Sequence, residues 1–313
     1  MNASKLFNPL ITIAIPTYNR AKTYLPSVIE CALNQTYKNI EIIISDNCSS
    51  DGTESVVKSY NGNHIRYIRH DPALTPNDNF NFCIKEAKGR YLLLLHDDDL
   101  IDNDFVEACV RELKKRGSDA GIVRTGTRLI NNDNVTIQEF PNNVVDLSTE
   151  EFFLGWFEGK TGMYVCSSLF NTEYLKEIGG FKSKSHLFQD VIAEFTLAAK
   201  YGRIDIKDIK ASFRKHNDSV GDVGKAYDWF EDSLLLLEVM CKLAEKDKDE
   251  IRKKGAANLS KKCYKHVYVI DSKYQRIRLY WHIYRRFNFA YSPIKFLYTD
   301  RIKKKIRKMA EKI

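Results

Sequence analysis

The chain lacks any pair of cysteines in a Cys-x-x-Cys spacing, although 7 of its 313 residues are cysteine. The cysteines are scattered and odd in number, which argues against a disulfide framework and against a zinc site built on cysteine. We therefore expect reduced thiols and a cytoplasmic protein.

Long apolar runs are also missing. No stretch approaches the roughly 20 consecutive apolar residues of a membrane span. The N-terminal run Leu10–Pro16 is too short for the core of a signal peptide, so it predicts a first strand instead. Internal repeats and low-complexity tracts are not evident. Because 43% of the residues are hydrophobic, we expect a sizeable core in one large domain with an appendage, or in two domains.

Charge is unevenly placed along the chain, whose formal net charge is +8. Residues 261–313 hold 16 Lys and Arg against 3 Asp and Glu, whereas the remaining residues hold 33 against 38. A mildly acidic body therefore carries a strongly basic tail.

The first half alternates short apolar strand patterns with helical patterns. Strands are predicted at Ile11–Ile15, Ile40–Ser45, His64–His70 and Tyr91–His96, and helices at Lys22–Asn34, Asp51–Tyr60, Asn77–Lys88 and Asp102–Lys115. Continuous apolar strands separated by helices predict a parallel sheet covered on both faces, in a doubly wound α/β fold. Ligands of such sheets bind beyond the carboxyl ends of the strands.

The second half has shorter elements and then only helices. It predicts a strand at Gly121–Thr125, a polar loop at Asn131–Asn143, a helix at Thr149–Glu158, a strand at Tyr164–Phe170 and a helix at Leu187–Tyr201. Beyond Gly224, helices are predicted at Ala226–Lys246, Ile251–Ile270, Lys273–Phe287 and Pro293–Lys312. A boundary near Gly221–Gly224 would divide the chain into residues 1–222 and a helical region, residues 223–313.

Three consecutive carboxylates, Asp97, Asp98 and Asp99, follow the apolar run Tyr91–Leu95. Like charges packed together repel, and a hard cation with oxygen ligands would relieve that penalty. Mg²⁺ or Mn²⁺ bound to a substrate diphosphate is such a cation. The alternative is a solvated acidic turn after a buried strand.

Three further residues are candidates, each with a structural alternative. Asp46 ends the second predicted strand and suits an N–H of a pyrimidine ring, but Asp also favours turns. Asp190 falls in the first turn of a helix, where the macrodipole favours an anion, and a carboxylate there suits a general base. His216 is either a metal ligand or an ordinary surface or core histidine.

The tail predicts an amphipathic basic helix. Its apolar stripe is Tyr298, Ile302, Ile306, Met309 and Ile313, and it is surrounded by Lys303, Lys304, Lys305, Arg307 and Lys308. This pattern is typical of a helix that lies on an anionic membrane face. A solvated helix packed on the body and a nucleic-acid patch are the competing interpretations.

These pieces together resemble a known family. The opening resembles that of family 2 inverting glycosyltransferases, in the string ITIAIPTYNRAKTYLPSVIECALNQTYKNIEIIISDNCSSDGTE. The resemblance implies the GT-A fold, a doubly wound, Rossmann-like mixed sheet, with a C-terminal helical region. The later pieces follow in the family's order: an AKGRY segment, the aspartate cluster, GGF, and an Asp in the next helix. The resemblance covers roughly residues 9–220 and is greatest to cytosolic transferases that build O-antigen, capsule or teichoic-acid glycans.

The resemblance implies a donor site at the strand ends. Pro16 and Tyr18 match positions that border the nucleotide base, and Asp46 matches the carboxylate that accepts its N3–H. Asp97 matches the position near the ribose.

It also implies a metal site and a catalytic base. Asp98 matches the metal-binding last Asp of the DxD motif, and His216 matches a histidine that completes the metal site in several relatives. Asp190 matches the catalytic base, the second acidic position of the usual Glu-Asp pair. The implied cofactor is Mn²⁺ or Mg²⁺.

The sequence departs from the family pattern at three places. The first Asp of DxD is His96, the acidic residue before the base is Gln189, and the frequent Arg-Asn before AKG is Phe80-Asn81. The last departure changes the residues that would hold the uracil and diphosphate on that side.

The resemblance implies a metal-dependent inverting glycosyltransferase that uses a nucleotide-sugar donor, with a UDP-sugar favoured. The implied acceptor is a hydroxyl of a glycan or lipid-linked glycan in cell-surface polysaccharide biosynthesis. We expect a peripheral location on the inner membrane face through the basic tail, and no nucleic acid partner. Whether the chain forms homo-oligomers is left undecided by the sequence. The alternatives are a sugar nucleotidyltransferase, which would need a Gly-rich phosphate loop that PTYNRAK lacks, and a non-enzymatic basic membrane- or nucleic-acid-binding protein.

Overall fold

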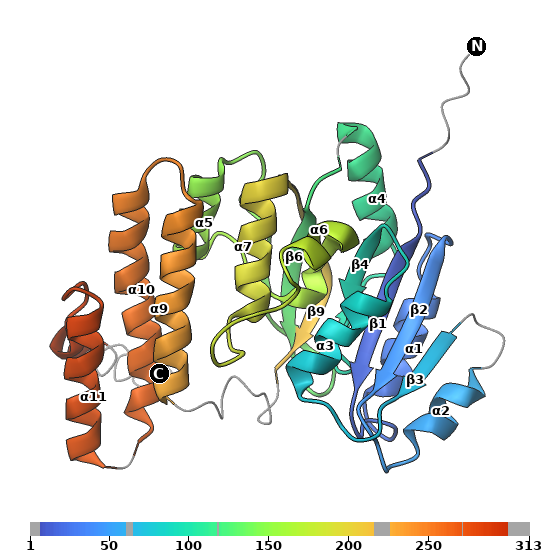
Figure 1. Ribbon diagram of the computed structural model, residues 1–313, viewed down its shortest axis with the longest axis horizontal. Helices are drawn as coiled ribbons and strands as arrows, with labels where there is room; N and C mark the ends of the chain where they lie inside the picture. The colour runs from blue at the N-terminus through green and yellow to red at the C-terminus, as the bar shows by residue number, and fades with distance from the viewer. Residues whose placement is uncertain (1–6, 61–64, 118, 216–225, 271, 300–313) are drawn as a thin grey trace, which may run out of the picture. The chain divides into compact units, whose positions relative to one another are not determined.

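A computed structural model describes residues 7–60, 65–117, 119–215, 226–270 and 272–299 (Figure 1). The chain forms two compact units. The first comprises Met1–Lys182 and Gln189–His216, and the second Ser183–Phe188 and Asn217–Ile313. The predicted boundary at Gly221–Gly224 lies outside the described residues, so the division at residue 222 stays a prediction.

A mixed nine-stranded sheet forms the centre of the first unit, in the order β3-β2-β1-β4-β8-β6-β9-β5 with β7 paired to β6. Its parallel part is β1 (Ile11–Thr17), β2 (Ile40–Asp46), β3 (Ile65–Arg69) and β4 (Tyr91–Leu94). The remaining strands are β5 (Leu100–Ile101), β6 (Ile122–Ile130), β7 (Thr136–Phe140), β8 (Ser168–Asn171) and β9 (Arg203–Arg214). β8 runs antiparallel between β4 and β6, and β6 is parallel to β9.

Helices cover the sheet because its strands are apolar on both faces. They are α1 (Leu25–Leu33), α2 (Thr53–Ser59), α3 (Pro76–Glu86), α4 (Phe105–Arg116), α5 (Thr149–Phe157), α6 (Thr172–Glu177) and α7 (Gln189–Tyr201). Ile13 and Leu93 pack with Val28 of α1 and Phe105 of α4 in one buried cluster. On the other face α3 contacts β1, β2 and β4 (Figure 1). The predicted doubly wound α/β fold is confirmed, and the sheet is mixed as the resemblance implies, with its parallel part where the apolar strand pattern predicted parallel pairing.

Several elements differ from the prediction, and β5 and the 12-residue β9 were not among the predicted strands. The stretch expected to be a polar loop contains β7, an exposed edge strand without the apolar alternation that marks a half-buried strand. β7 forms because β6 supplies its hydrogen-bonding partners. The sequence of β7 alone therefore does not predict that it is a strand. The strand expected from Tyr164 begins as the 3-10 turn η1 (Val165–Ser167). The sequence analysis also missed α6, whose six residues are too few to show a helical period.

The second unit is helical, as predicted. It contains α9 (Ala226–Leu243), α10 (Lys248–Tyr268), α11 (Lys273–Arg286) and a helical stretch at residues 293–299. Its core includes Phe230, Leu259, Tyr264 and Ile283. None of the described helices is long and apolar enough to cross a membrane. The tail residues from Ile302 onward lie outside the described residues.

Buried Asp232 explains why Ser183–Phe188 belongs to the helical unit. The Asp232 carboxylate accepts hydrogen bonds from the Ser183 hydroxyl and from the backbone N–H groups of Ser185 and Leu187, each at 2.8 Å. A fully buried carboxylate is stable only when its oxygens are hydrogen-bonded in this way.

Candidate active site

Polar residues that follow β1, β2 and β4 lie at one edge of the sheet. The three strands are parallel neighbours, and Thr17 at the end of β1 is in register with Asp46 at the end of β2. The backbone N–H of Tyr18 donates to Oδ2 of Asp97 at 3.1 Å. The predicted donor residues Tyr18 and Asp97 are therefore in contact.

The loop after β1 is tied to the loop after β2. The backbone N–H of Asn19 donates to Ser49 Oγ, and the N–H of Ser50 donates to Asn19 Oδ1, both at 2.9 Å. Asn19 has φ +54°, a left-handed conformation that asparagine tolerates well. Pro16 is buried in β1, whereas Tyr18 is exposed, with 56% of its surface accessible. An exposed ring on a hydrogen-bonded loop is suited to stacking on a planar ligand.

Asp46 is held as a buried acceptor, with 1% of its surface exposed. Its Oδ1 accepts from the Ser49 N–H at 2.9 Å, and its Oδ2 accepts from the Tyr67 hydroxyl at 2.5 Å. Burial and then the Asp46 charge raise the pKa of Tyr67, so the phenol keeps its proton. The bond to Ser49 is the turn interaction expected if Asp46 served only to form a turn. Each carboxylate oxygen can accept one more hydrogen bond.

Asp97 contacts the loop after β1 through the Tyr18 backbone. Burial and then the Asp98 charge raise its pKa to about 6, and the hydrogen bond from the Tyr18 N–H opposes the rise. Arg20 also opposes it, with its Nε 4.0 Å from Asp97 Oδ1. The like-charge penalty expected from the sequence is therefore present.

Asp99 is fully buried, which a solvated acidic turn would not require. Its Oδ1 accepts from the backbone N–H of Arg214 at 2.8 Å. Burial and then the Asp98 charge raise the pKa of Asp99 well above its usual range. The three aspartates therefore have different surroundings: Asp97 and Asp98 are half-buried, whereas Asp99 is buried and stabilises the turn through its bond to the Arg214 backbone.

Arg214 at the end of β9 holds this turn, and the sequence analysis missed it. Its Nε donates to the carbonyl of Asp98, and its Nη1 to the carbonyl of Asn131, both at 2.7 Å. The guanidinium carbon lies 4.5 Å from the centre of the Tyr24 ring. An arginine that is 2% exposed is unusual, but its burial could not be read from a strand pattern.

His96, Asp98 and Asp99 form a cluster whose donor atoms all lie within 4.8 Å of one another. Burial lowers the pKa of His96, which keeps the imidazole neutral as a metal ligand requires. Its buried Nε2 has no hydrogen-bond partner among the described residues, and the ring stacks on Phe80 at 5.0 Å. Carboxylate oxygens with one imidazole suit Mn²⁺, so the residues present fit a divalent cation.

Two predicted ligands have different outcomes. Asp98 belongs to the cluster, whereas His216 lies outside the described residues. His96, which departs from the DxD pattern, occupies a place in the cluster that the sequence analysis did not give it. Its position directly before three aspartates was the available signal.

Asp190 lies in the first turn of α7, as predicted. Its Oδ1 accepts from the backbone N–H of Val191 at 2.9 Å. Burial raises the pKa of Asp190 to about 6, and the hydrogen bonds from backbone N–H groups oppose the rise. A carboxylate with a raised pKa is a stronger base and is still mostly ionised at neutral pH.

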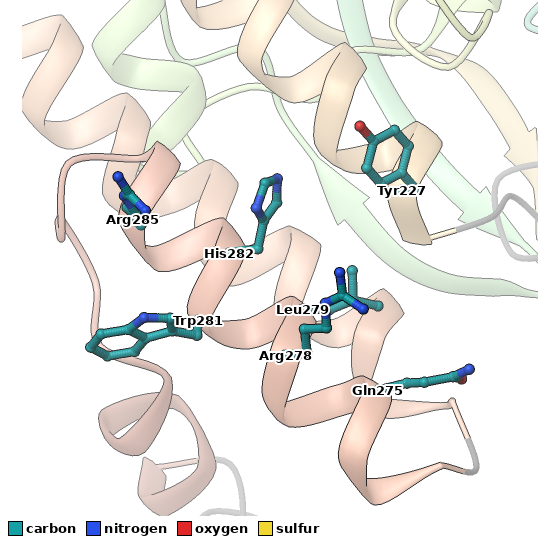
Figure 2. A pocket seen from close by; sticks show the side chains of 7 residues that line it. All are labelled: Tyr227, Gln275, Arg278, Leu279, Trp281, His282 and Arg285. Atoms are coloured by element: carbon teal, nitrogen blue, oxygen red, sulfur yellow. The ribbon is translucent and has the colours of Figure 1, made fainter.

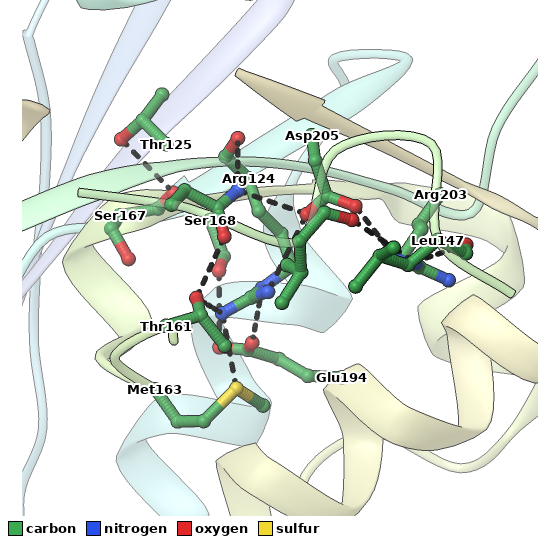
Figure 3. Close-up of polar contacts among 12 residues, drawn as sticks. Arg124, Thr125, Leu147, Thr161, Met163, Ser167, Ser168, Glu194, Arg203 and Asp205 are labelled. Atoms are coloured by element: carbon green, nitrogen blue, oxygen red, sulfur yellow. Dashed lines mark hydrogen bonds and ion pairs between the residues drawn. The ribbon is translucent and has the colours of Figure 1, made fainter. Parts of the chain in front are cut away.

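Glu194, one helical turn after Asp190, joins α7 to the sheet (Figure 3). Its Oε2 accepts from Nε of Arg124 on β6 at 2.9 Å, and its Oε1 accepts from the Ser168 hydroxyl on β8 at 3.0 Å. Burial raises the pKa of Glu194 to about 7; Arg124 opposes the rise and Asp190 adds to it. These contacts set the position of the helix that carries Asp190.

Arg124 is fully buried and has further partners on its other side (Figure 3). Its Nη2 donates to the carbonyl of Gly162 at 2.6 Å, and its Nη1 lies 3.5 Å from Asp205 Oδ1. Arg203 Nε donates to Asp205 Oδ2 at 2.7 Å. Two arginines and two carboxylates thus form a charge-balanced group, called here the Arg124 network: Arg124, Glu194, Asp205 and Arg203.

The GGF motif has a structural explanation. Gly180 has φ +74°, and a Cβ there would lie 2.3 Å from Asn81 Oδ1. Asn81 on α3 accepts from the Phe181 N–H at 2.9 Å and donates to the Phe181 carbonyl at 3.0 Å. Asn81 therefore secures the turn that follows α6.

Comparison with known proteins decides the family. The model of glycosyl transferase family 2 matches residues 12–179, more than half of the chain. The chain belongs to glycosyl transferase family 2. The resemblance stated from the sequence is therefore confirmed.

Curated relatives of this family 2 chain are themselves glycosyltransferases by name. An uncharacterized glycosyltransferase of Rickettsia felis is 33% identical over 59% of this chain, but only 31% of the relative is covered. The Escherichia coli UDP-Glc:alpha-D-GlcNAc-diphosphoundecaprenol beta-1,3-glucosyltransferase WfaP is 39% identical over 28% of this chain and 34% of its own length. The chain thus spans about a third of the length of these relatives.

Solved structures show the same fold. The Staphylococcus aureus TarS 1–349 structure in complex with UDP-GlcNAc superposes with a TM-score of 0.68 at 14% identity, over 90% of this chain and 81% of that one. The mannosyltransferase PcManGT from Pyrobaculum calidifontis, in complex with GDP-Man and Mn²⁺, gives a TM-score of 0.56 at 15% identity, over 95% and 87%. The family 2 chain therefore has the GT-A type of fold that was predicted.

Proposed function

We propose that this family 2 chain is a metal-dependent inverting glycosyltransferase. It would move a sugar from a nucleotide-sugar donor, with a UDP-sugar favoured, to a hydroxyl of a glycan or lipid-linked glycan in cell-surface polysaccharide biosynthesis. The observation that carries the proposal is the His96–Asp98–Asp99 cluster at the carboxyl end of β4. Ligands of open α/β sheets bind at this edge.

The donor assignment rests on the residues beside that cluster. The exposed ring of Tyr18, with Pro16, would border the nucleotide base, and Asp46 would accept the base N3–H. Asp97, in contact with the Tyr18 backbone, would face the ribose. A UDP-sugar is favoured because TarS was solved with UDP-GlcNAc and WfaP is named for UDP-Glc.

The proposed reaction is a single displacement. The Asp190 carboxylate takes the proton of the acceptor hydroxyl as that oxygen attacks the anomeric carbon from the face opposite the nucleotide. The new carbon–oxygen bond forms while the bond to the diphosphate breaks, and the bonding electron pair leaves with the nucleoside diphosphate. The anomeric configuration is inverted, and catalysis comes from positioning and electrostatics.

A divalent cation would be held by Asp98, with His96 and Asp99 beside it and His216 as the further ligand proposed from the sequence. Such a cation, when bound, supplies Lewis-acid stabilisation of the charge on the leaving diphosphate. The protein itself fixes the Asp98 backbone through Arg214 and holds the His96 ring against Phe80.

The proposal is tested by the thermal stability of the protein with a panel of nucleotide sugars. Ligands that bind the folded state raise the melting temperature by mass action. We expect Mn²⁺ with one nucleotide sugar to give a shift that EDTA removes. Asp98→Ala should lose the metal-dependent part of this shift, because a ligand carboxylate is gone. Binding by this variant that equals wild type and ignores EDTA would contradict the assignment.

The rate of transfer is expected to fall at acidic pH. The raised pKa of Asp190, about 6, means that its carboxyl holds a proton more tightly than an ordinary aspartate. The basic form is therefore lost as pH falls through about 6, and the rate should drop along a single-proton limb. A profile of initial rate against pH checks this at saturating donor. A limb near the ordinary aspartate value of 3.8 would contradict a buried base.

The remaining assignments are proposals from the sequence. The helical region, residues 223–313, is proposed to contact an anionic membrane through the basic tail, so that the protein is peripheral on the inner face. Acceptor binding and homo-oligomer formation are the other roles proposed for this region. Removal of residues 292–313 distinguishes a transferase from a basic binding module. A transferase should still transfer or hydrolyse the donor in detergent, whereas a binding module would lose its function.

A further inference from the structure

α11 carries an exposed surface that is both aromatic and basic. Tyr274, Ile277 and Trp281 are at least 60% exposed, and their spacing of three and four residues places them on one helix face. Residues 272–299 hold six Lys and Arg and no Asp or Glu. The face therefore presents aromatic, apolar and basic side chains to solvent together.

A groove of about 480 Å³ lies beside this face, where Tyr227 of α9 stands across from α11 (Figure 2). Its lining is Tyr227, Gln275, Arg278, Leu279, Trp281, His282 and Arg285. Among the described residues no carboxylate lines it. Guanidinium, imidazole, amide and phenol groups are hydrogen-bond donors, so the groove suits a phosphate or another oxyanion.

The groove is held in place by packing beneath it. The ring of His282 meets the buried ring of Phe230 edge-on, with 5.2 Å between centroids. Glu231 on α9 is a nearby carboxylate, but it pairs with Lys184 at 2.5 Å. Lys184 and then Arg286 lower its pKa, so Glu231 is already neutralised by cations.

We propose that the face of α11 and its groove bind an anionic lipid bilayer, with lipid phosphates at Arg278, Arg285 and His282. Charge complementarity favours this occupant, because each basic residue near an anionic surface adds roughly fivefold to affinity. Tyr and Trp with one apolar and one polar end are enriched at membrane–water interfaces. The inference deepens the membrane contact proposed for the tail but uses different residues and does not depend on sugar transfer.

The experiment is cosedimentation of the full chain with vesicles. Wild type should bind vesicles of phosphatidylcholine mixed with phosphatidylglycerol and should not bind phosphatidylcholine alone. Arg278→Glu with Arg285→Glu should weaken binding by at least about tenfold, because two cations become anions. Lys114→Glu with Lys115→Glu on α4 makes the same change in net charge at exposed positions and is the matched control. All variants keep residues 300–313, so the tail cannot explain a loss.

A second readout follows Trp281. Its emission should shift to the blue when phosphatidylglycerol vesicles are added, and Trp281→Phe should remove that component. A melting temperature equal to that of wild type shows that a variant folds. If the variant with two Glu substitutions fails to fold, Arg278→Gln with Arg285→Gln replaces it. Their donor-dependent thermal shift should be unchanged, which separates this result from a failure of the proposed transferase function.

Several results would overturn the proposal. One is that wild type and the Arg278/Arg285 variant bind anionic vesicles equally well. Another is that wild type binds neutral vesicles as well as it binds anionic ones. Self-association that this variant abolishes, without vesicle binding, would assign the face to a second copy of the chain. Tight binding of RNA without vesicle binding would assign it to nucleic acid. A thermal shift with soluble glycerol phosphate alone, again without vesicle binding, would assign the groove to a soluble phosphate.

Discussion

Asp190→Asn is expected to lower the rate of sugar transfer by roughly 10²–10⁴-fold, the usual contribution of a general base. The amide has nearly the same shape as the carboxylate but cannot take the proton of the acceptor hydroxyl. Donor binding should change little, because the proposed donor residues belong to the ends of β1, β2 and β4. Steady-state transfer rates and donor-dependent thermal shifts measure the two effects separately.

Asp208→Asn is the matched control, since Asp208 is an exposed aspartate of β9 in the same unit. The same chemical change there should leave transfer near the wild-type rate. Normal turnover by Asp190→Asn would contradict its role as base. Loss of both turnover and donor binding would show that Asp190 shapes the donor site instead.

Arg124→Met is expected to lower the free energy of unfolding by about 3–5 kcal/mol, the usual effect of removing one partner of a buried ion pair. Methionine fills part of the space, but the Glu194 carboxylate is left buried without its cation. Urea unfolding measures the loss. The matched control is Arg116→Met, which removes a more exposed pair with Asp146 and should cost at most about 1 kcal/mol.

The destabilisation by Arg124→Met should grow with pH. The pKa of Glu194 is already raised to about 7 from 4.5, and loss of Arg124 removes the main group that lowers it. The folded variant therefore binds a proton more tightly than the unfolded chain, so its stability falls as pH rises from about 4.5 through the folded pKa. Adding Glu194→Gln should remove this dependence. Equal stability of Arg124→Met and wild type at all pH values would show that the network is unimportant.

Much of the fold could be predicted because its signals are local. β1, β2 and β4 are continuous apolar runs, and α4 ends at Gly117 with its basic residues in the last turn, so each element carries its own pattern. β7 lacked such a pattern because its hydrogen-bond partners belong to β6. η1 and α6 were missed because three to six residues are too few to show a period.

The candidate site was predicted in part. Tyr18, Asp46, Asp97 and Asp98 could be named because they directly follow apolar strands, where parallel topology gathers polar residues. Arg214 could not, because its partners come from segments distant in the sequence. The same is true of Arg124 and Glu194, which are 70 residues apart.

The sequence by itself determined the family, the α/β class, the helical second region and the set of carboxylates near the strand ends. These depend on local periodicity and on the order of short motifs, both of which are written along the chain. Only the tertiary structure decided that Asp99 is buried, that His96 stands beside Asp98, and that the Arg124 network joins the helix of Asp190 to the sheet. The physical reason is that burial, and the pKa shifts that follow from it, depend on which distant segments exclude water from a side chain.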